Sequence, residues 1–131
     1  MPTLDTNVLV RYLVADDKNQ FEIAKNLIDT ADHDKKFFIP ISVSIELEWV
    51  LRTLYEFTKP TILDTYTGLL EAREILFQEA SSVEVALNLY TDHNADFADC
   101  FHIAIAYSNG VEPLLTFDRK ASRVPGAAIL E

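Results

Sequence analysis

The sequence is poor in cysteine and glycine, and each shortage excludes a class of protein. A single cysteine, Cys100, cannot form an internal disulfide, and no Cys/His spacing fits a structural zinc site. Three glycines and five prolines are scattered, so they form no linker, repeat, P-loop or dinucleotide-binding pattern. The 131 residues, 49% of them hydrophobic, are therefore expected to form one domain, 1–131, with Cys100 buried as a small hydrophobe.

Long apolar runs and basic residues are also scarce. No apolar segment approaches the roughly 20 residues that a membrane helix needs, and the start lacks a basic region, so we expect a soluble cytoplasmic protein with no membrane partner. The net charge of −10 argues against nonspecific nucleic-acid binding, which needs basic stripes. It does not exclude a nuclease, because cations bound at an acidic metal site would cancel negative charge. The same acidity suits a basic protein partner.

Short apolar strands alternate with helical patterns along the whole chain. Strands are expected at 3–4, 37–39, 74–77, 113–117 and 127–130, with helices between them. This alternation predicts a three-layer α/β/α sandwich around a central parallel sheet of about five short strands. Core positions are expected for Trp49 and for the apolar face of the helix at 20–31. Serines are expected to cap two helices: Ser42 or Ser44, and Ser81 or Ser82.

Four acids stand where an expected strand ends or an expected helix begins. They are Asp5, Glu46, Asp99 and Asp118. Because ligands bind at the carboxyl ends of parallel strands, Asp5, Glu46 and Asp118 are expected to converge on one edge of the sheet. Asp99 can join them from the first turn of the helix expected at 96–108.

Carboxylates brought this close repel one another, and a hard divalent cation removes the conflict. Mg²⁺ and Mn²⁺ prefer oxygen ligands and need only one or two direct carboxylates, so four acids can serve one ion or two. Two ions about 4 Å apart would stabilise both the attacking and the leaving oxygen of a phosphodiester displacement. Asn7 can orient a carboxylate or a water molecule. Asp96, three residues before Asp99 on the same helix face, is a candidate additional acid.

Each acid also has a purely structural explanation. Asp5 can cap the first helix, Glu46 can lie on an exposed helix face, and Asp118 can be a turn residue. Asp99 is harder to explain in this way, since it lies inside an otherwise apolar helix. Glu48, two residues beyond Glu46, is expected to be solvated. The joint placement of four such acids favours the metal site.

The histidines are weaker candidates. His33 lies in a charged loop that is expected to be solvated. His102 follows Asp99 at i+3, a spacing that can bind a transition metal on one helix face. No second Glu-x-x-His motif accompanies it, so a di-iron site is not expected and His102 is expected to pack or to face a partner.

Four segments together resemble the PIN-domain family, and within it the VapC-like toxins of toxin-antitoxin pairs. They are the opening Leu4-Asp5-Thr6-Asn7-Val8-Leu9, the segment Ile45-Glu46-Leu47, the segment Ala98-Asp99-Cys100-Phe101 and the segment Leu115-Thr116-Phe117-Asp118. Each is short, but their order and spacing together are specific, and the match spans nearly the whole chain.

The resemblance implies a metal-dependent endoribonuclease that hydrolyses RNA phosphodiester bonds without a side-chain nucleophile. It implies that Asp5 and Asp99 bind Mg²⁺ or Mn²⁺ most directly, while Glu46 and Asp118 assist by positioning metal or water. It also implies a homodimer, and a cognate antitoxin whose tail covers the acidic pocket.

Two other functions are compatible with a strand-end aspartate. A haloacid-dehalogenase-type phosphatase needs a second aspartate two residues after the first, where this chain has Asn7. A non-catalytic, receiver-like module that binds Mg²⁺ needs paired acids close to the first strand, whereas Asp16 and Asp17 lie a helix away.

Overall fold

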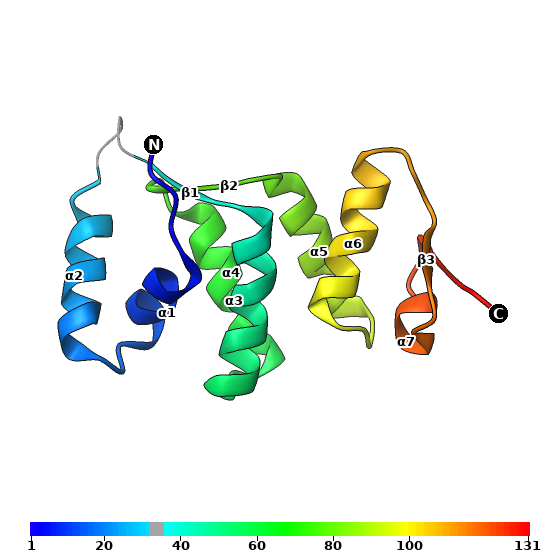
Figure 1. The fold of residues 1–131 in the computed structure, drawn as a ribbon, viewed down its shortest axis with the longest axis horizontal. Coiled ribbons are helices and arrows are strands. Elements are labelled where there is room, and N and C mark those ends of the chain that lie inside the picture. Colours follow the sequence, from blue (N-terminus) through cyan, green and yellow to red (C-terminus); the bar gives the residue numbers. More distant parts are fainter. Residues whose placement is uncertain (32–35) are drawn as a thin grey trace. The chain divides into compact units, whose positions relative to one another are not determined.

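The computed structural model describes residues 1–31 and 36–131 (Figure 1). Helices and short strands alternate along the described chain, so the expected α/β class is confirmed. The loop residue His33, expected to be solvated, lies outside the described residues. The chain divides into two compact units, Met1–Gln78 and Glu79–Glu131.

The described part of the first unit contains four helices and two strands: α1 (Thr6–Val14), α2 (Lys18–Asp29), β1 (Phe37–Ile39), α3 (Ile41–Leu54), α4 (Lys59–Glu71) and β2 (Ile75–Phe77). Strands β1 and β2 pair in parallel, with Phe38 opposite Leu76. Thr3 adds an isolated parallel bridge to Phe38, and the Leu4 amide donates to the Phe38 carbonyl at 2.9 Å. The strand expected at 3–4 is therefore present as a single bridge beside β1.

Side-chain oxygens start three helices of the first unit. Asp5 caps α1, Asp17 caps α2 by accepting from the Gln20 amide, and Thr58 caps α4. The serine cap expected for α3 is wrong, because Pro40 precedes the helix and supplies no side-chain cap. With the helix starting at Ile41, Glu46 lies in the second turn of α3.

The core of the first unit lies between its two strands and its helices. Fully buried side chains come from α1, β1, α3 and α4: Leu9, Ile39, Leu47, Leu51, Ile62 and Tyr66. The Tyr66 ring stacks on Phe77 with ring centroids 6.3 Å apart, and its hydroxyl donates to the backbone carbonyl of Ser44. Burial of these side chains fixes α3 against α4 and holds one face of α3 inward.

The second unit contains α5 (Ala80–Asp92), α6 (Phe97–Ser108), β3 (Leu114–Thr116), α7 (Arg119–Ser122) and β4 (Ala127–Ile129). Helices α5 and α6 pack together through Tyr90, Phe97 and Phe101, whose neighbouring ring centroids are 5.4 and 5.8 Å apart. Cys100 is buried as expected. The expected serine cap of α5 is wrong, since Glu79 precedes the helix with a positive φ of 55°.

The sheet is smaller in the described residues than the sequence predicts. Strands β3 and β4 pair in parallel, as β1 and β2 do, so the described residues form two two-stranded parallel sheets. Parallel pairing is confirmed, whereas a five-stranded sheet and a single domain stay predictions. None of the helices in the described part of the chain is long and apolar enough to cross a membrane.

Two adjacent residues on α3 lie in environments opposite to those expected from the sequence. Glu48, expected to be solvated, is buried, and its carboxylate accepts from Arg52 Nε at 2.8 Å. Trp49, expected in the core, is 53% exposed. The buried face of α3 passes through Ser44, Leu47, Glu48 and Leu51. Trp49 therefore points away from the core, and the ion pair with Arg52 makes burial of Glu48 tolerable.

Because Glu48 is buried, loss of its ion pair with Arg52 should lower stability more than loss of an exposed ion pair. The Glu48 side chain is 3% exposed, so Arg52→Ala leaves a buried carboxylate without this partner. We expect the free energy of unfolding to fall by about 1–3 kcal/mol, measured by urea denaturation. The control is Lys25→Ala, which removes an ion pair of the same i,i+4 spacing between two exposed side chains, and it should change nothing measurable. Equal losses in both variants would contradict the role given to burial.

Candidate functional site

Asp5 and Asn7 lie at the start of α1, directly after the buried Leu4. Asp5 is exposed and has an extended backbone, and its Oδ1 accepts from the Thr6 amide at 2.8 Å. Its Oδ2 has no hydrogen-bond partner among the described residues. The capping explanation of Asp5 is therefore correct for one carboxylate oxygen, and the other oxygen stays available to a ligand.

Glu46 lies on the exposed side of α3, in the same unit as Asp5. Helix α3 contacts α1, and the buried side of α3 carries Ser44, Leu47, Glu48 and Leu51. Three of the candidate site residues are therefore exposed polar side chains of the first unit: Asp5, Asn7 and Glu46.

Asp99 lies in the first turn of α6 in the second unit, where two other acids lie near it. Its pKa is raised, first by burial and then by the carboxylates of Asp118 and Asp96, while His102 acts in the opposite direction. Asp96 and Asp118 therefore lie near enough to Asp99 for their charges to act on it. His102 is exposed on the same helix.

Asp118 is fixed by two local hydrogen bonds at the end of β3. Its Oδ1 accepts from the Ala121 amide at 2.8 Å and caps α7, while its own amide donates to Thr116 Oγ1 at 3.0 Å. Thr116 is a positioning residue that the sequence reasoning missed. In the sequence, the spacing Thr-x-Asp at the end of an expected strand could have indicated this role.

The donor set fits a hard divalent cation. The acids offer only oxygen ligands. The pKa of Asp99 is raised first by burial and then by the neighbouring carboxylates, whose repulsion a cation would relieve. No group of three or more potential ligands in metal-binding geometry occurs among residues 1–31 and 36–131. Asp5 and Glu46 belong to the first unit, and Asp99 and Asp118 belong to the second.

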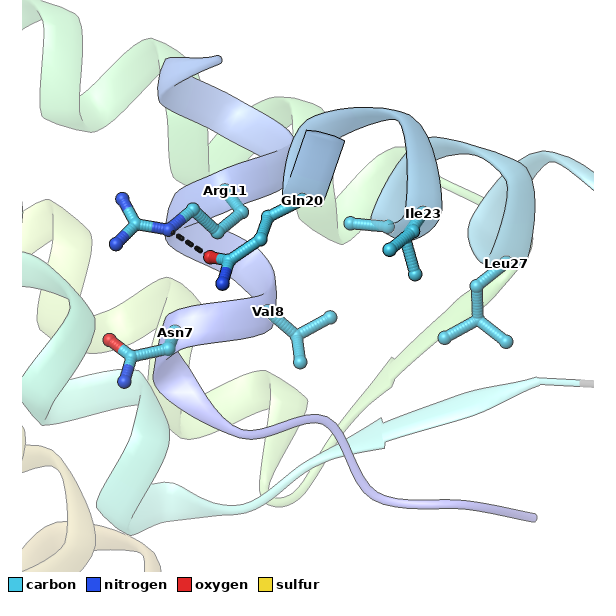
Figure 2. A pocket seen from close by; sticks show the side chains of 7 residues that line it. Asn7, Val8, Arg11, Gln20, Ile23 and Leu27 are labelled. Atoms are coloured by element: carbon cyan, nitrogen blue, oxygen red, sulfur yellow. Dashed lines mark hydrogen bonds between the residues drawn. The ribbon is translucent and has the colours of Figure 1, made fainter. Parts of the chain in front are cut away.

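A groove of about 290 Å³ lies between α1 and α2 and begins beside Asn7 (Figure 2). Its lining is mainly apolar and comprises Asn7, Val8, Arg11, Gln20, Ile23, Ala24 and Leu27. Ile23 and Leu27 were expected in the core, but they are 69% and 44% exposed. Figure 2 shows Val8 on α1 facing these two side chains on α2.

Arg11 fixes the geometry of this groove by joining three segments. Its Nε donates to Gln20 Oε1 at 2.6 Å, and its Nη1 donates to Asp16 at 2.8 Å and to the Tyr55 hydroxyl at 3.2 Å. The Tyr55 hydroxyl in turn donates to Asp16 at 3.0 Å. The hydrogen bond with Tyr55, followed by that with Asp16, raises the pKa of Arg11. The helical hairpin α1–α2 is thereby tied to the end of α3.

Comparison with known proteins identifies the class to which this fold and these acids belong. The family model described as PIN domain matches residues 3–127, so the chain belongs to the PIN-domain family. The chain is also similar to a VapC ribonuclease of Aquifex aeolicus (strain VF5). The two are 23% identical over 124 residues, which cover 95% of this chain and 92% of that protein.

The raised pKa of Asp99 predicts a pH-dependent effect of Asp99→Asn on stability. The folded state holds this proton more tightly than the unfolded chain does, so ionised Asp99 lowers stability above its folded pKa. The penalty vanishes below the unfolded pKa of about 3.9. The metal-free variant should therefore melt at a higher temperature than the parent protein near pH 7, and the difference should shrink as the pH falls toward 4.

Thermal unfolding in the presence of a chelator measures this difference. Glu84→Gln, which removes an exposed carboxylate from α5 of the same unit, controls for the change in net charge. A difference between Asp99→Asn and the parent protein that is the same at both pH values would show that carboxylate repulsion does not act on Asp99.

Proposed function

We propose that this protein is a metal-dependent endoribonuclease that hydrolyses RNA phosphodiester bonds in the cytoplasm, as the toxin of a toxin-antitoxin pair. The observation that carries the proposal is the match of residues 3–127 to the PIN-domain family, and the charges of Asp118 and Asp96 that act on Asp99 agree with an acidic metal site. Similarity to a VapC ribonuclease supports RNA as the substrate. The same family match disfavours the phosphatase and the receiver-like module.

Each proposed site residue has a role that suits its surroundings. Asp5 and Asp99 are the proposed direct ligands of Mg²⁺ or Mn²⁺, and the uncommitted Oδ2 of Asp5 supports this role. Glu46 and Asp118 are proposed to position the cation or a water molecule, with Asp118 held in place by Thr116 and the Ala121 amide. Asn7 is proposed to orient a neighbouring oxygen, and Asp96 is the candidate additional acid.

The chemistry needs no side-chain nucleophile. When bound, a divalent cation supplies the Lewis acidity that makes water a nucleophile at neutral pH and stabilises the charge of the departing oxygen. An exposed carboxylate such as Glu46 can accept the proton that the attacking water loses. Hydrolysis then breaks one P–O bond of the RNA backbone and forms another to the oxygen of water.

A single centre made from all four acids requires the complete sheet of the PIN fold. We propose that the strands of both units belong to one parallel sheet of about five strands, within a single domain. The family match over residues 3–127, which spans both units, supports a single domain, and the parallel pairing within each unit agrees with a parallel sheet. We also propose a homodimer, and this proposal rests on the resemblance to VapC-like toxins.

Replacement of a proposed metal ligand should abolish cleavage without unfolding the protein. Asp5→Asn keeps an oxygen that can accept from the Thr6 amide, so α1 keeps its cap. Asp5→Asn and Asp99→Asn should each lower Mn²⁺-dependent cleavage of labelled RNA at least about 100-fold, because even indirect partners of a metal commonly contribute 10- to 100-fold. Asp64→Asn, which changes an exposed acid on α4, should retain full activity.

The same assay separates the competing functions. It compares labelled RNA with a phosphomonoester, in Mn²⁺ and in a chelator, after removal of any bound antitoxin. Full activity of Asp5→Asn or Asp99→Asn would refute the assigned ligands. Turnover of the phosphomonoester without metal-stimulated RNA cleavage would indicate the phosphatase. No activity on either substrate would indicate the binding module.

The groove between α1 and α2 is proposed to bind an apolar segment of the cognate antitoxin. Ile23 and Leu27 expose apolar surface beside Asn7, where a bound segment would also lie close to the acid Asp5. The net charge of −10 favours a partner with basic residues around that segment.

A charge placed in this groove should weaken the complex with the antitoxin and spare catalysis. Ile23→Glu forces a carboxylate into an apolar interface, so we expect the dissociation constant to rise at least about tenfold while RNA cleavage is unchanged. Leu54→Glu places the same charge on an exposed leucine of α3 that does not line the groove, and it should bind normally. Titration calorimetry with the purified antitoxin measures both, and equal affinities for the two variants would exclude the groove.

A further inference from the structure

Trp49 is an exposed aromatic side chain on the same face of α3 as the proposed catalytic acid Glu46. The two residues are three apart, so they are neighbours on the helix surface. Trp49 is 53% exposed, although a side chain of this size ordinarily buries a large apolar area. Its exposure therefore calls for an explanation that core packing does not supply.

The exposed side chains that share one stripe of α3 with Trp49 are polar. At helical spacing, the exposed stripe of α3 passes through Ser42, Glu46, Trp49 and Thr53, and all four residues are solvent-accessible. A protein-docking face normally presents a contiguous apolar patch, whereas this stripe offers one flat ring between small hydroxyl side chains and a carboxylate. The stripe suits a ligand that needs a single stacking surface and polar contacts around it.

The helix beneath Trp49 is anchored by its buried side chains. The opposite face of α3 is anchored by the fully buried Leu47 and Leu51, and the Thr53 hydroxyl donates to the Trp49 carbonyl at 2.6 Å. Arg52 is held by its bond to the buried Glu48. The Cα atom of Trp49 thus lies three residues, or roughly 4.5 Å along the helix axis, from the level of Glu46.

We infer that Trp49 is a stacking platform for an unpaired base of the RNA substrate, next to the phosphodiester that is cut. This inference rests on the proposed ribonuclease function and adds a substrate-binding residue to it. Stacking is independent of charge, which matters in a chain of net charge −10, because its overall charge repels the phosphates of RNA. A base can stack on Trp49 only when it is free of its own neighbours, so the substrate is a single strand or a loop.

The chain permits a direct optical test, because Trp49 is its only tryptophan. Full-length Asp5→Asn protein, which should bind RNA without cutting it, is titrated with a single-stranded RNA oligonucleotide while tryptophan emission and RNA anisotropy are recorded together. Emission should be quenched in step with binding, and the ring should become protected from acrylamide. Unchanged emission and unchanged acrylamide access at RNA saturation would overturn the inference, as would protection of Trp49 that follows protein concentration in the absence of RNA.

Variants at position 49 test the energetic contribution. In the Asp5→Asn background, Trp49→Ala should bind the oligonucleotide about fivefold to 100-fold more weakly, the range measured for the loss of one base–aromatic stack. Trp49→Phe should retain much of the affinity because it keeps a flat ring. Leu54→Ala, which removes an exposed apolar side chain from another face of α3, should bind like the parent. Equal binding by Trp49→Ala and Leu54→Ala would overturn the inference.

Cleavage assays separate this inference from the function on which it rests. With the catalytic acids intact, Trp49→Ala should raise KM for RNA more than it lowers kcat. Thermal unfolding of each variant shows that the fold is kept. Metal-dependent cleavage with an unchanged KM in Trp49→Ala would refute the platform alone, whereas an absence of cleavage by the parent protein would refute the ribonuclease.

Discussion

Repulsion between carboxylates is the interaction on which the proposed site depends. Asp99 is partly buried at the start of α6, and Asp118 and Asp96 lie close enough to raise its pKa further. A fold that places acids together in this way stores an electrostatic cost that a divalent cation removes. The same cost explains why such acids occur where function, and not stability, determines the residue.

Two of the acids of the proposed site also serve local structure. Asp5 caps α1 with one oxygen, and Asp118 caps α7 while its amide is held by Thr116. Capping fixes the carboxylate at the point where the chain passes from strand to helix, so the geometry of the helix start also sets the geometry of the ligand. Helix capping and metal binding are therefore compatible roles for one aspartate.

Local sequence patterns predicted the elements well but predicted environments on α3 poorly. Strand β1 has the expected bounds because three apolar residues end at Pro40, which cannot continue the ladder. Ser44 does not cap α3, since Pro40 starts the helix earlier. Glu48 and Trp49 were assigned to the wrong sides because hydrophobicity alone ignores the ion pair that Arg52 supplies. The prediction that Ile23 and Leu27 lie in the core was also wrong, because an apolar helix face can border a groove as well as a core.

The candidate acids were proposed from the sequence because each was expected to follow an apolar strand or to begin a helix, although Glu46 lies in the second turn of α3. Their assembly could not be derived in this way, because short local patterns carry no information on how distant segments meet. Thr116 and Arg11 were missed as positioning residues, since their roles depend on hydrogen bonds to Asp118 and to Asp16, Gln20 and Tyr55. The effect of the Asp118 charge on Asp99 likewise required the structure.

Paramagnetic broadening by Mn²⁺ tests the central claim, a shared four-carboxylate metal site, most directly. In spectra of the ¹⁵N-labelled protein, substoichiometric Mn²⁺ should broaden the backbone amides around Asp5, Glu46, Asp99 and Asp118 together, before any others, and excess Mg²⁺ should restore them. Broadening that is confined to one of the two units, or spread evenly over the exposed acids of the chain, would contradict a single shared centre.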